Sequence, residues 1–265
     1  MVLASVFILF MSFVIRWKTT QANLILFKNF NQKEKRNILL INLSSAALLA
    51  LNWFLFIYVM NRVSVNATSL AYLICPILTT VLAFFILKEH LSNKQKLAIG
   101  ISIFSCLLLA IGHFMDLVYS MIIAMSYATY LILQKKNNQL DKFFTLTAQI
   151  VFGSILLSPL FMTDHGSSVE KSNLFYILTA VIAVVFTIIP MFLNVYALKK
   201  LNSSVVGIFI NINPILSFLL AVLYFNEKVN LIQGIAYGLI FCSVLLFNLD
   251  ALQGNLKKRF VTEKN

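Results

Sequence analysis

Long apolar runs separated by short polar stretches make up most of this chain. A helix that crosses a bilayer needs roughly 20 mostly apolar residues, and in lipid only helices and closed barrels satisfy their own backbone polar groups. The runs are continuous, whereas barrel strands would alternate apolar and polar residues. The pattern therefore predicts an all-α integral membrane protein with about nine spans, at Val2 to Trp17, Asn37 to Met60, Asn66 to Leu87, Leu97 to Gly112, Met115 to Leu133, Phe144 to Met162, Asn173 to Leu198, Ser203 to Phe225 and Leu231 to Leu252.

The composition agrees with lipid as the solvent of most of the chain. Of its 265 residues, 60% are hydrophobic and 11% are charged, against about 45 to 50% and 25% in soluble domains. The net charge of +12 does not indicate a nucleic-acid partner, because the basic residues cluster between apolar runs instead of along one face. Cys75, Cys106 and Cys242 lie inside apolar runs without metal-ligand spacing, so we expect them to be core residues.

The Lys and Arg residues predict how the chain crosses the membrane. Nine spans place the termini on opposite sides, and cytoplasmic loops carry an excess of Lys and Arg. A cytoplasmic C-terminus puts 18 of the 21 basic residues inside and leaves only Arg62, Lys171 and Lys228 outside. We therefore expect a multi-pass protein of the cytoplasmic membrane. Its first span has positive charges after the apolar run, which favours a retained helix over a cleaved signal peptide.

The two halves of the chain match each other at an offset of 138 positions. Pro76 pairs with Pro214 at this offset, and further identical pairs follow without a gap: Tyr58 and Tyr196, Glu89 and Glu227, Gln95 and Gln233, Gly100 and Gly238. The offset shifts the chain by five spans, and an odd shift inverts the orientation in the membrane. Inverted repeats are typical of secondary transporters, in which a midplane site opens to each side in turn.

The repeat also predicts the domain organisation. We expect a first repeat of four spans at residues 1–112, a second of five spans at 113–253, and a basic cytoplasmic tail at 254–265. The partner of the span at Met115 to Leu133 would precede residue 1, so the first repeat lacks one helix. A homodimer would be one way to close the resulting gap.

The segment Asn52 to Ser92, NWFLFIYVMNRVSVNATSLAYLICPILTTVLAFFILKEHLS, resembles the RarD-type permeases of the EamA group in the drug/metabolite transporter superfamily. It carries their Asn-Trp pair, the Tyr-x-x-x-Pro of the next helix and the Glu that ends that helix. Pro190 and the later segment GIFININPILSFLLAVLYFNEK agree, and Tyr130 followed by Lys135 and Lys136 is similar to the sixth helix of the family.

The resemblance implies a ten-helix fold of two inverted repeats, and export or exchange of a small metabolite or drug-like solute. This chain departs from it by lacking the first helix and by having Gln134 where the family commonly has an arginine. We expect a permease without cofactor or metal that works by alternating access. An inactive relative shortened at its N-terminus is the alternative. A membrane-embedded enzyme or receptor is less favoured, since no H-E-x-x-H motif or other catalytic constellation is present. The sequence has no phosphate-binding Gly-Lys-Ser/Thr loop, so we do not expect a nucleotide to energise transport within this chain.

Candidate substrate-binding residues are polar, aromatic and proline positions within the spans, because polar groups in hydrocarbon usually face a cavity or each other. They are Asn52, Trp53, Tyr58, Tyr72, Pro76, Tyr130, Asn211, Asn213 and Pro214. An interhelical hydrogen bond is the equal alternative for Asn52, and an interfacial belt is the alternative for Trp53 and Tyr58. Each proline frees a carbonyl one turn earlier, which predicts either a binding site or a simple kink.

Two carboxylates end equivalent spans in the two halves. Glu89 follows Lys88, and Glu227 precedes Lys228. Both positions lie where a span meets a loop. We expect a helix cap or an ion pair there instead of a buried, proton-carrying carboxylate.

Overall fold

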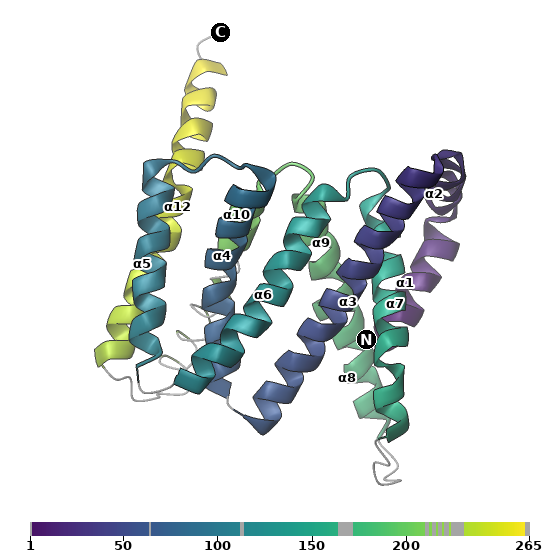
Figure 1. Ribbon diagram of the computed structural model, residues 1–265, viewed down its shortest axis with the longest axis horizontal. Coiled ribbons are helices and arrows are strands. Elements are labelled where there is room, and N and C mark those ends of the chain that lie inside the picture. The colour runs from purple at the N-terminus through teal and green to yellow at the C-terminus, as the bar shows by residue number, and fades with distance from the viewer. Residues whose placement is uncertain are drawn as a thin grey trace. The chain divides into compact units, whose positions relative to one another are not determined.

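The computed structural model describes residues 2–63, 65–111, 114–163, 172–209, 212–213, 216, 219, 223 and 231–262. Its elements are helices, drawn in Figure 1, and no strand occurs in these ranges. They are α1 Val2–Phe10, the π-helix η1 Met11–Ile15, α2 Trp17–Asn29, α3 Gln32–Arg62, α4 Val65–Leu87, α5 Asn93–Leu109, α6 Phe114–Lys136, α7 Lys142–Thr163, α8 Asn173–Ala183, the π-helix η2 Val184–Ile188, α9 Ile189–Ala197, α10 Ser203–Phe209 and α12 Leu231–Thr262.

Several of these helices are long and apolar enough to cross a membrane. Five qualify in the described ranges, and a bent pair near the N-terminus makes six if it is one span. The protein is therefore an all-α, multi-pass membrane protein. The five are Gln32–Arg62, Ala67–Leu87, Phe114–Lys136, Lys142–Pro159 and Asn173–Ala197. All five coincide with predicted spans, whereas the total of nine stays a prediction.

The first predicted span ends earlier than expected. It was placed at Val2 to Trp17, but Val2–Ile15 meets α2 at an angle of 93°. Arg16 makes the corner with φ −110° and ψ 27°. On α2, the Thr20 hydroxyl donates to the Ser12 carbonyl at 2.8 Å, which holds the bend. The apolar pattern did not predict α2, because its 13 residues mix polar and apolar side chains and form no continuous apolar run.

The chain forms two compact units, and each combines segments from both halves of the sequence. Unit 1 consists of Met1–Phe54 and Leu133–Leu201, and unit 2 consists of Leu55–Ile132 and Asn202–Asn265. A shift of 138 positions moves residues 1–54 to 139–192, inside the second segment of unit 1. The same shift moves residues 64–127 to 202–265, the second segment of unit 2. Each unit therefore brings equivalent stretches of the two halves together.

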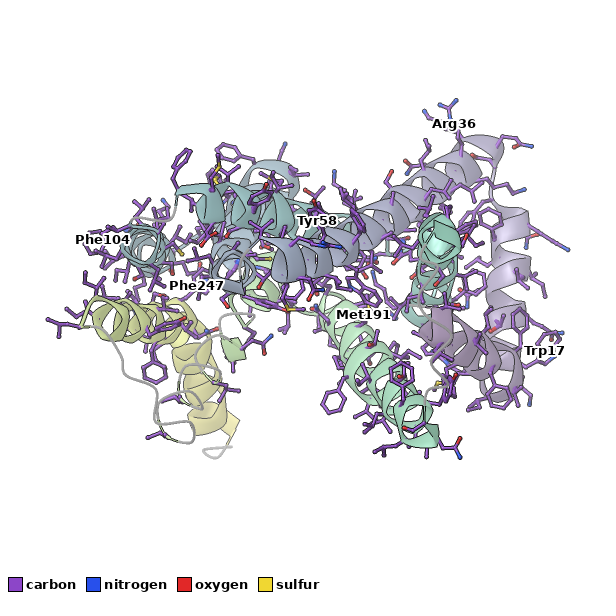
Figure 2. The ribbon with its side chains drawn as sticks, turned by 90° about the horizontal axis from the view of Figure 1, so that it is seen from below. Trp17, Arg36, Tyr58, Phe104, Met191 and Phe247 are labelled. Atoms are coloured by element: carbon purple, nitrogen blue, oxygen red, sulfur yellow. The ribbon has the colours of Figure 1, made fainter. Side chains whose placement is uncertain are left out.

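Apolar contacts between helices form the core of unit 2. One cluster joins residues of α4, α5, α6 and α12, among them Ile74, Cys106, Ala124 and Ile240. A second cluster packs Phe247 of α12 against Ala98 of α5. Phe104 of α5, by contrast, is exposed and lies on the periphery of the side chains in Figure 2. These helices thus bury one face and leave an apolar face for lipid.

The cysteines follow this division. Cys75 and Cys106 are buried, as predicted. The prediction is wrong for Cys242, which is exposed. It lies on α12 next to the buried Ser243, which faces α5. An apolar run in a membrane helix does not distinguish the core face from the lipid face, since both are apolar.

Candidate functional site

The helix with the first repeat proline belongs to unit 2 and continues through that residue. Pro76 lies inside α4 and is buried. The Thr79 hydroxyl donates to the Cys75 carbonyl, and the Thr80 hydroxyl donates to the Pro76 carbonyl, both at 2.8 Å. Threonine side chains commonly return such bonds to the preceding turn of a membrane helix. The proline therefore causes no break in α4.

The aromatic candidates of unit 2 occupy different environments. Tyr72 precedes Pro76 by one turn, is exposed, and meets the ring of Phe56 edge-on with centroids 5.5 Å apart. Tyr58 is also exposed. Tyr130 is buried and stacks on Tyr127 at 5.7 Å. Only the two exposed tyrosines present their rings outside the packed core of this unit.

The other candidates divide between unit 1, unit 2 and the chain outside the described residues. Asn52 is buried and Trp53 is half-buried, both on the part of α3 that belongs to unit 1. Asn213 is exposed, in unit 2. Asn211 and Pro214 lie outside the described residues. The substrate-binding role of all nine stays a prediction.

A buried network of amide side chains in unit 1 was missed by the sequence analysis. Gln134 donates through Nε2 to Gln149 Oε1. Gln149 in turn donates to Asn42 Oδ1 at 2.8 Å, and Asn137 donates to the same oxygen at 3.0 Å. Asn42 then donates to the Ile38 carbonyl at 2.8 Å. The four amides thus connect α3, α6 and α7 and the turn after α6.

One acceptor of this network has no partner. Gln134 Oε1 is buried and makes no hydrogen bond to any described residue. Gln134 is the position where the resembled family commonly has an arginine. The available signal in the sequence was the occurrence of Asn42 and Gln149 inside apolar runs. Polar residues in that setting face a neighbouring helix or a cavity.

Two lysines satisfy carbonyl groups at helix ends in unit 1. Lys142 is completely buried, and its Nζ donates to the Gln134 carbonyl at 2.7 Å and the Asn137 carbonyl at 2.5 Å. Lys135 donates to the carbonyls of Leu198 and Leu201 at 2.8 and 2.5 Å. The last carbonyls of a helix lack intrahelical donors and carry partial negative charge. Both ammonium groups are therefore placed where they stabilise helix ends.

Glu89 caps a helix of the other half of the sequence within unit 2. Its Oε1 accepts from the Ser203 amide at 2.8 Å, and its Oε2 accepts from the Ser204 amide at 3.2 Å and the Ser204 hydroxyl at 2.6 Å. Carboxylates at helix N-termini are stabilising because they accept from free amides and oppose the helix dipole. Of the cap and the ion pair that were predicted as alternatives for Glu89, the structure has the cap, and the helix that it caps is α10. Glu227 lies outside the described residues.

The end of α4 positions this carboxylate. Lys88 has a positive φ of 55°, and the Glu89 amide donates back to the Ala83 carbonyl at 3.2 Å. This is the left-handed turn that commonly ends helices. Earlier in α4, at Thr79, this helix approaches α10 so closely that a Cβ added to Gly207 would lie 2.9 Å from Thr79 Cβ. Glycine at residue 207 therefore permits the contact between the two helices.

The polar groups described above are hydrogen-bonding groups. Within the described ranges, no three His, Cys, Asp or Glu residues come together as a metal site. Amides, hydroxyls and helix-capping charges predominate. Such groups can bind and orient a polar solute without changing it chemically.

Comparison with known proteins assigns the family. The model of the EamA-like transporter family matches residues 1–111 and, separately, 115–249. The chain belongs to the EamA-like transporter family. Together with the RarD relatives described next, this match confirms the resemblance to RarD-type permeases, and membership favours transport over catalysis.

Individual relatives agree with this assignment. Protein RarD of Streptomyces exfoliatus is 28% identical over 218 residues, covering 81% of this chain and 69% of that protein. Protein RarD of Escherichia coli is 28% identical over 217 residues, covering 78% and 71%. The uncharacterized transporter YojE of Bacillus subtilis is 26% identical over 222 residues, covering 83% and 74%. A solved crystal structure shares the fold, with a TM-score of 0.57 and 14% sequence identity. The match covers 94% of this chain and 97% of the chain in that structure.

Proposed function

We propose that this member of the EamA-like family is a secondary transporter that moves a small metabolite or drug-like solute by alternating access. The observation that carries the proposal is the composition of the compact units, each of which joins segments related by the 138-residue offset. Equivalent segments in contact are what a pair of inverted repeats produces. Inverted repeats provide two alternative, symmetry-related conformations, as alternating access requires.

The topology proposed with this function has nine spans, with repeats at residues 1–112 and 113–253 and a cytoplasmic tail at 254–265. It places the C-terminus in the cytoplasm, supported by the distribution of Lys and Arg. Asn52 and Tyr72 are the candidate binding residues best suited to a test. Both lie in spans and carry hydrogen-bonding groups, and neither participates in the helix caps described above.

Solute flux in proteoliposomes tests the proposal. Solutes that raise the unfolding temperature of the purified protein would be selected from a panel and assayed for uptake. Alternating access predicts that unlabelled solute loaded inside accelerates the entry of labelled solute, because the site returns occupied. We expect Asn52→Ala to reduce this exchange and Asn138→Ala, in an exposed turn, to leave it unchanged. Flux without such acceleration would indicate a channel and contradict the proposal.

A further inference from the structure

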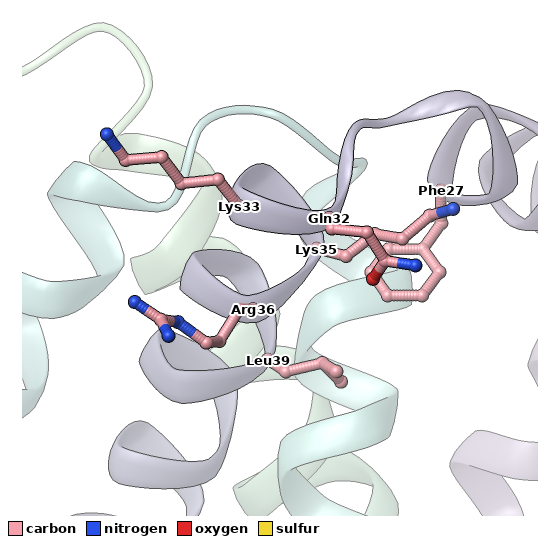
Figure 3. Close-up of a pocket in the computed structure, with 6 residues that line it drawn as sticks. All are labelled: Phe27, Gln32, Lys33, Lys35, Arg36 and Leu39. Atoms are coloured by element: carbon pink, nitrogen blue, oxygen red, sulfur yellow. The ribbon is translucent and has the colours of Figure 1, made fainter.

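A cavity of about 590 Å³ lies where α2 ends and α3 begins, within unit 1. Figure 3 shows its six lining side chains. Three of them are basic, two are apolar, and one is an amide: Lys33, Lys35, Arg36, Phe27, Leu39 and Gln32. The cavity therefore combines positive charge with an apolar wall, and an occupant should have both an anionic group and a hydrocarbon part.

The positive charge of this cavity is not neutralised by nearby acids. Glu34 lies among the three basic residues in the sequence but does not line the cavity. It caps the start of α3: its Oε2 accepts from the Asn31 amide at 3.0 Å, and its own amide donates to Asn31 Oδ1 at 2.8 Å. Arg16 pairs with Asp141, whereas Lys33, Lys35 and Arg36 form no ion pair with any described carboxylate.

We place the cavity at the boundary of the membrane, from the helices around it. Its lining on α3 comes from the first two turns of that helix, and α3 as a whole is a candidate span. Since α2 runs at 93° to the first apolar helix, it lies roughly in the plane of the interface when that helix is upright. Figure 2 shows Trp17 at the start of α2 and Arg36 beyond its far end. Tryptophan at this level is typical of the headgroup region.

An exposed apolar track leads from the cavity into the membrane. Leu39 lines the cavity, and Leu40 and Leu43 follow on α3, with exposed fractions of 46%, 55% and 44%. On α2, Ile25 is 60% exposed. A helix in the interface plane with exposed apolar residues inserts them into the boundary between headgroups and acyl chains. The track therefore begins where acyl chains begin.

We propose that this cavity binds an anionic phospholipid of the surrounding membrane. The phosphate lies against Lys35 and Gln32, on the same side of α3 as Phe27 and Leu39, along which an acyl chain lies (Figure 3). Lys33 and Arg36 point to the other side of α3 and add to the positive potential at this end of the helix. Basic pockets beside membrane helices attract anionic headgroups electrostatically, and long basic side chains reach such groups while their stems cover apolar surface. A soluble anion would use the charges but not the apolar track. The bound lipid would anchor α2 and the start of α3 at the interface.

Native mass spectrometry of the purified full chain tests this site, with phosphatidylglycerol and phosphatidylcholine added separately. We expect selective retention of phosphatidylglycerol that weakens as ionic strength rises. The triple variant K33Q/K35Q/R36Q should bind phosphatidylglycerol about a hundredfold more weakly, since each basic residue near an anionic surface lowers the dissociation constant about fivefold and the three factors multiply. The charge-retaining variant K33R/K35R/R36K should keep the affinity, which separates loss of charge from loss of folding.

A matched control and two contrary results complete the test. The variant K257Q/K258Q/R259Q removes three basic residues from the C-terminal end of α12 and should leave binding unchanged. Equal loss in this control, or equal retention of phosphatidylcholine, would overturn the proposal. Inorganic phosphate that displaces the lipid at millimolar concentration would show a soluble-anion site instead. Leu39→Asn should weaken the binding of phosphatidylglycerol without changing the binding of inorganic phosphate. None of these measurements needs a transported solute, so their outcome is independent of the proposed transport.

Discussion

At the scale of single residues, buried polar groups distinguish unit 1 from a purely apolar bundle. Asn42 Oδ1 accepts from both Gln149 and Asn137, and Asn42 itself donates to a backbone carbonyl. Removing one partner of a buried hydrogen bond leaves the other group unsatisfied, which costs about 1 to 3 kcal/mol. The Asn42 side chain therefore satisfies three buried polar groups: the amides of Gln149 and Asn137 and the Ile38 carbonyl.

Replacing Asn42 by alanine should destabilise the protein by about 2 to 4 kcal/mol, because the amides of Gln149 and Asn137 both lose their acceptor. The midpoint of unfolding in detergent measures the effect. Asn138→Ala is the control, since Asn138 is exposed and its side chain donates to the Lys135 carbonyl, outside the network. Equal midpoints for the two variants would contradict a structural role for the network.

Lys142→Met should also lower stability, by about 2 kcal/mol, because the carbonyls of Gln134 and Asn137 lose a charged donor while the side-chain volume is kept. Lys136→Met removes an exposed lysine from the end of α6 and should change stability little. Thermal unfolding of both variants gives the comparison. A Lys142→Met protein as stable as the wild type would mean that water replaces the ammonium at these carbonyls.

At the scale of elements, the contact between α4 and α10 depends on a cap and a glycine that come from different halves of the sequence. The sequence predicted that a helix ends at Glu89, and that this carboxylate forms a cap or an ion pair. The sequence did not predict which helix Glu89 caps, because Glu89 and Ser203 are 114 positions apart. The choice of partner for a cap is a property of the packed helices.

Glu89→Gln should weaken the start of α10 by about 1 to 2 kcal/mol, since the side chain loses its charge and one acceptor but keeps its length. Hydrogen exchange at the amides of Ser203 and Ser204 should rise in this variant. Lys88→Gln alters the adjacent residue without touching these hydrogen bonds and serves as the control. Unchanged exchange in Glu89→Gln would show that the cap is not formed in the membrane.

Gly207→Ala should destabilise the protein by about 1 to 3 kcal/mol, because the new methyl group would lie 2.9 Å from Thr79 and force the two helices apart. Gly100→Ala and Gly238→Ala are matched controls within helices, since nothing lies within 4 Å of an added Cβ at either position. They should be neutral or slightly stabilising, because alanine favours the helix. A neutral Gly207→Ala would contradict the close approach.

At the scale of the whole molecule, each compact unit contains one segment from either half of the chain. The internal repeat in the sequence shows that the two halves are similar, and the structure shows that their equivalent segments pack together. The proposed topology determines which loops face the cytoplasm. It is the part of the proposal that can be tested without knowing the solute.

Single cysteines at residues 31 and 167 should react oppositely with an impermeant thiol reagent on intact cells. Asn31→Cys should be protected, because the loop around it carries Lys28, Lys33 and Lys35, and Ser167→Cys should be labelled. Cys75, Cys106 and Cys242 must first be replaced, Cys242 above all because it is exposed. Labelling at residue 31 with protection at residue 167 would reverse the proposed orientation.

The sequence by itself determined that the chain is helical, lies in a membrane and belongs to the EamA-like family, because apolar runs of spanning length and the Asn-Trp, proline and glutamate positions are local features. It also located five spans found in the structure. The tertiary structure decided which faces are buried: Cys242 is exposed, Asn42 and Gln149 are paired, and Glu89 caps α10. It also decided the bend at Arg16 that creates α2 and the basic cavity. Lipid and protein interior are equally apolar, so hydrophobicity alone does not select a face, and only contacts between distant segments do so.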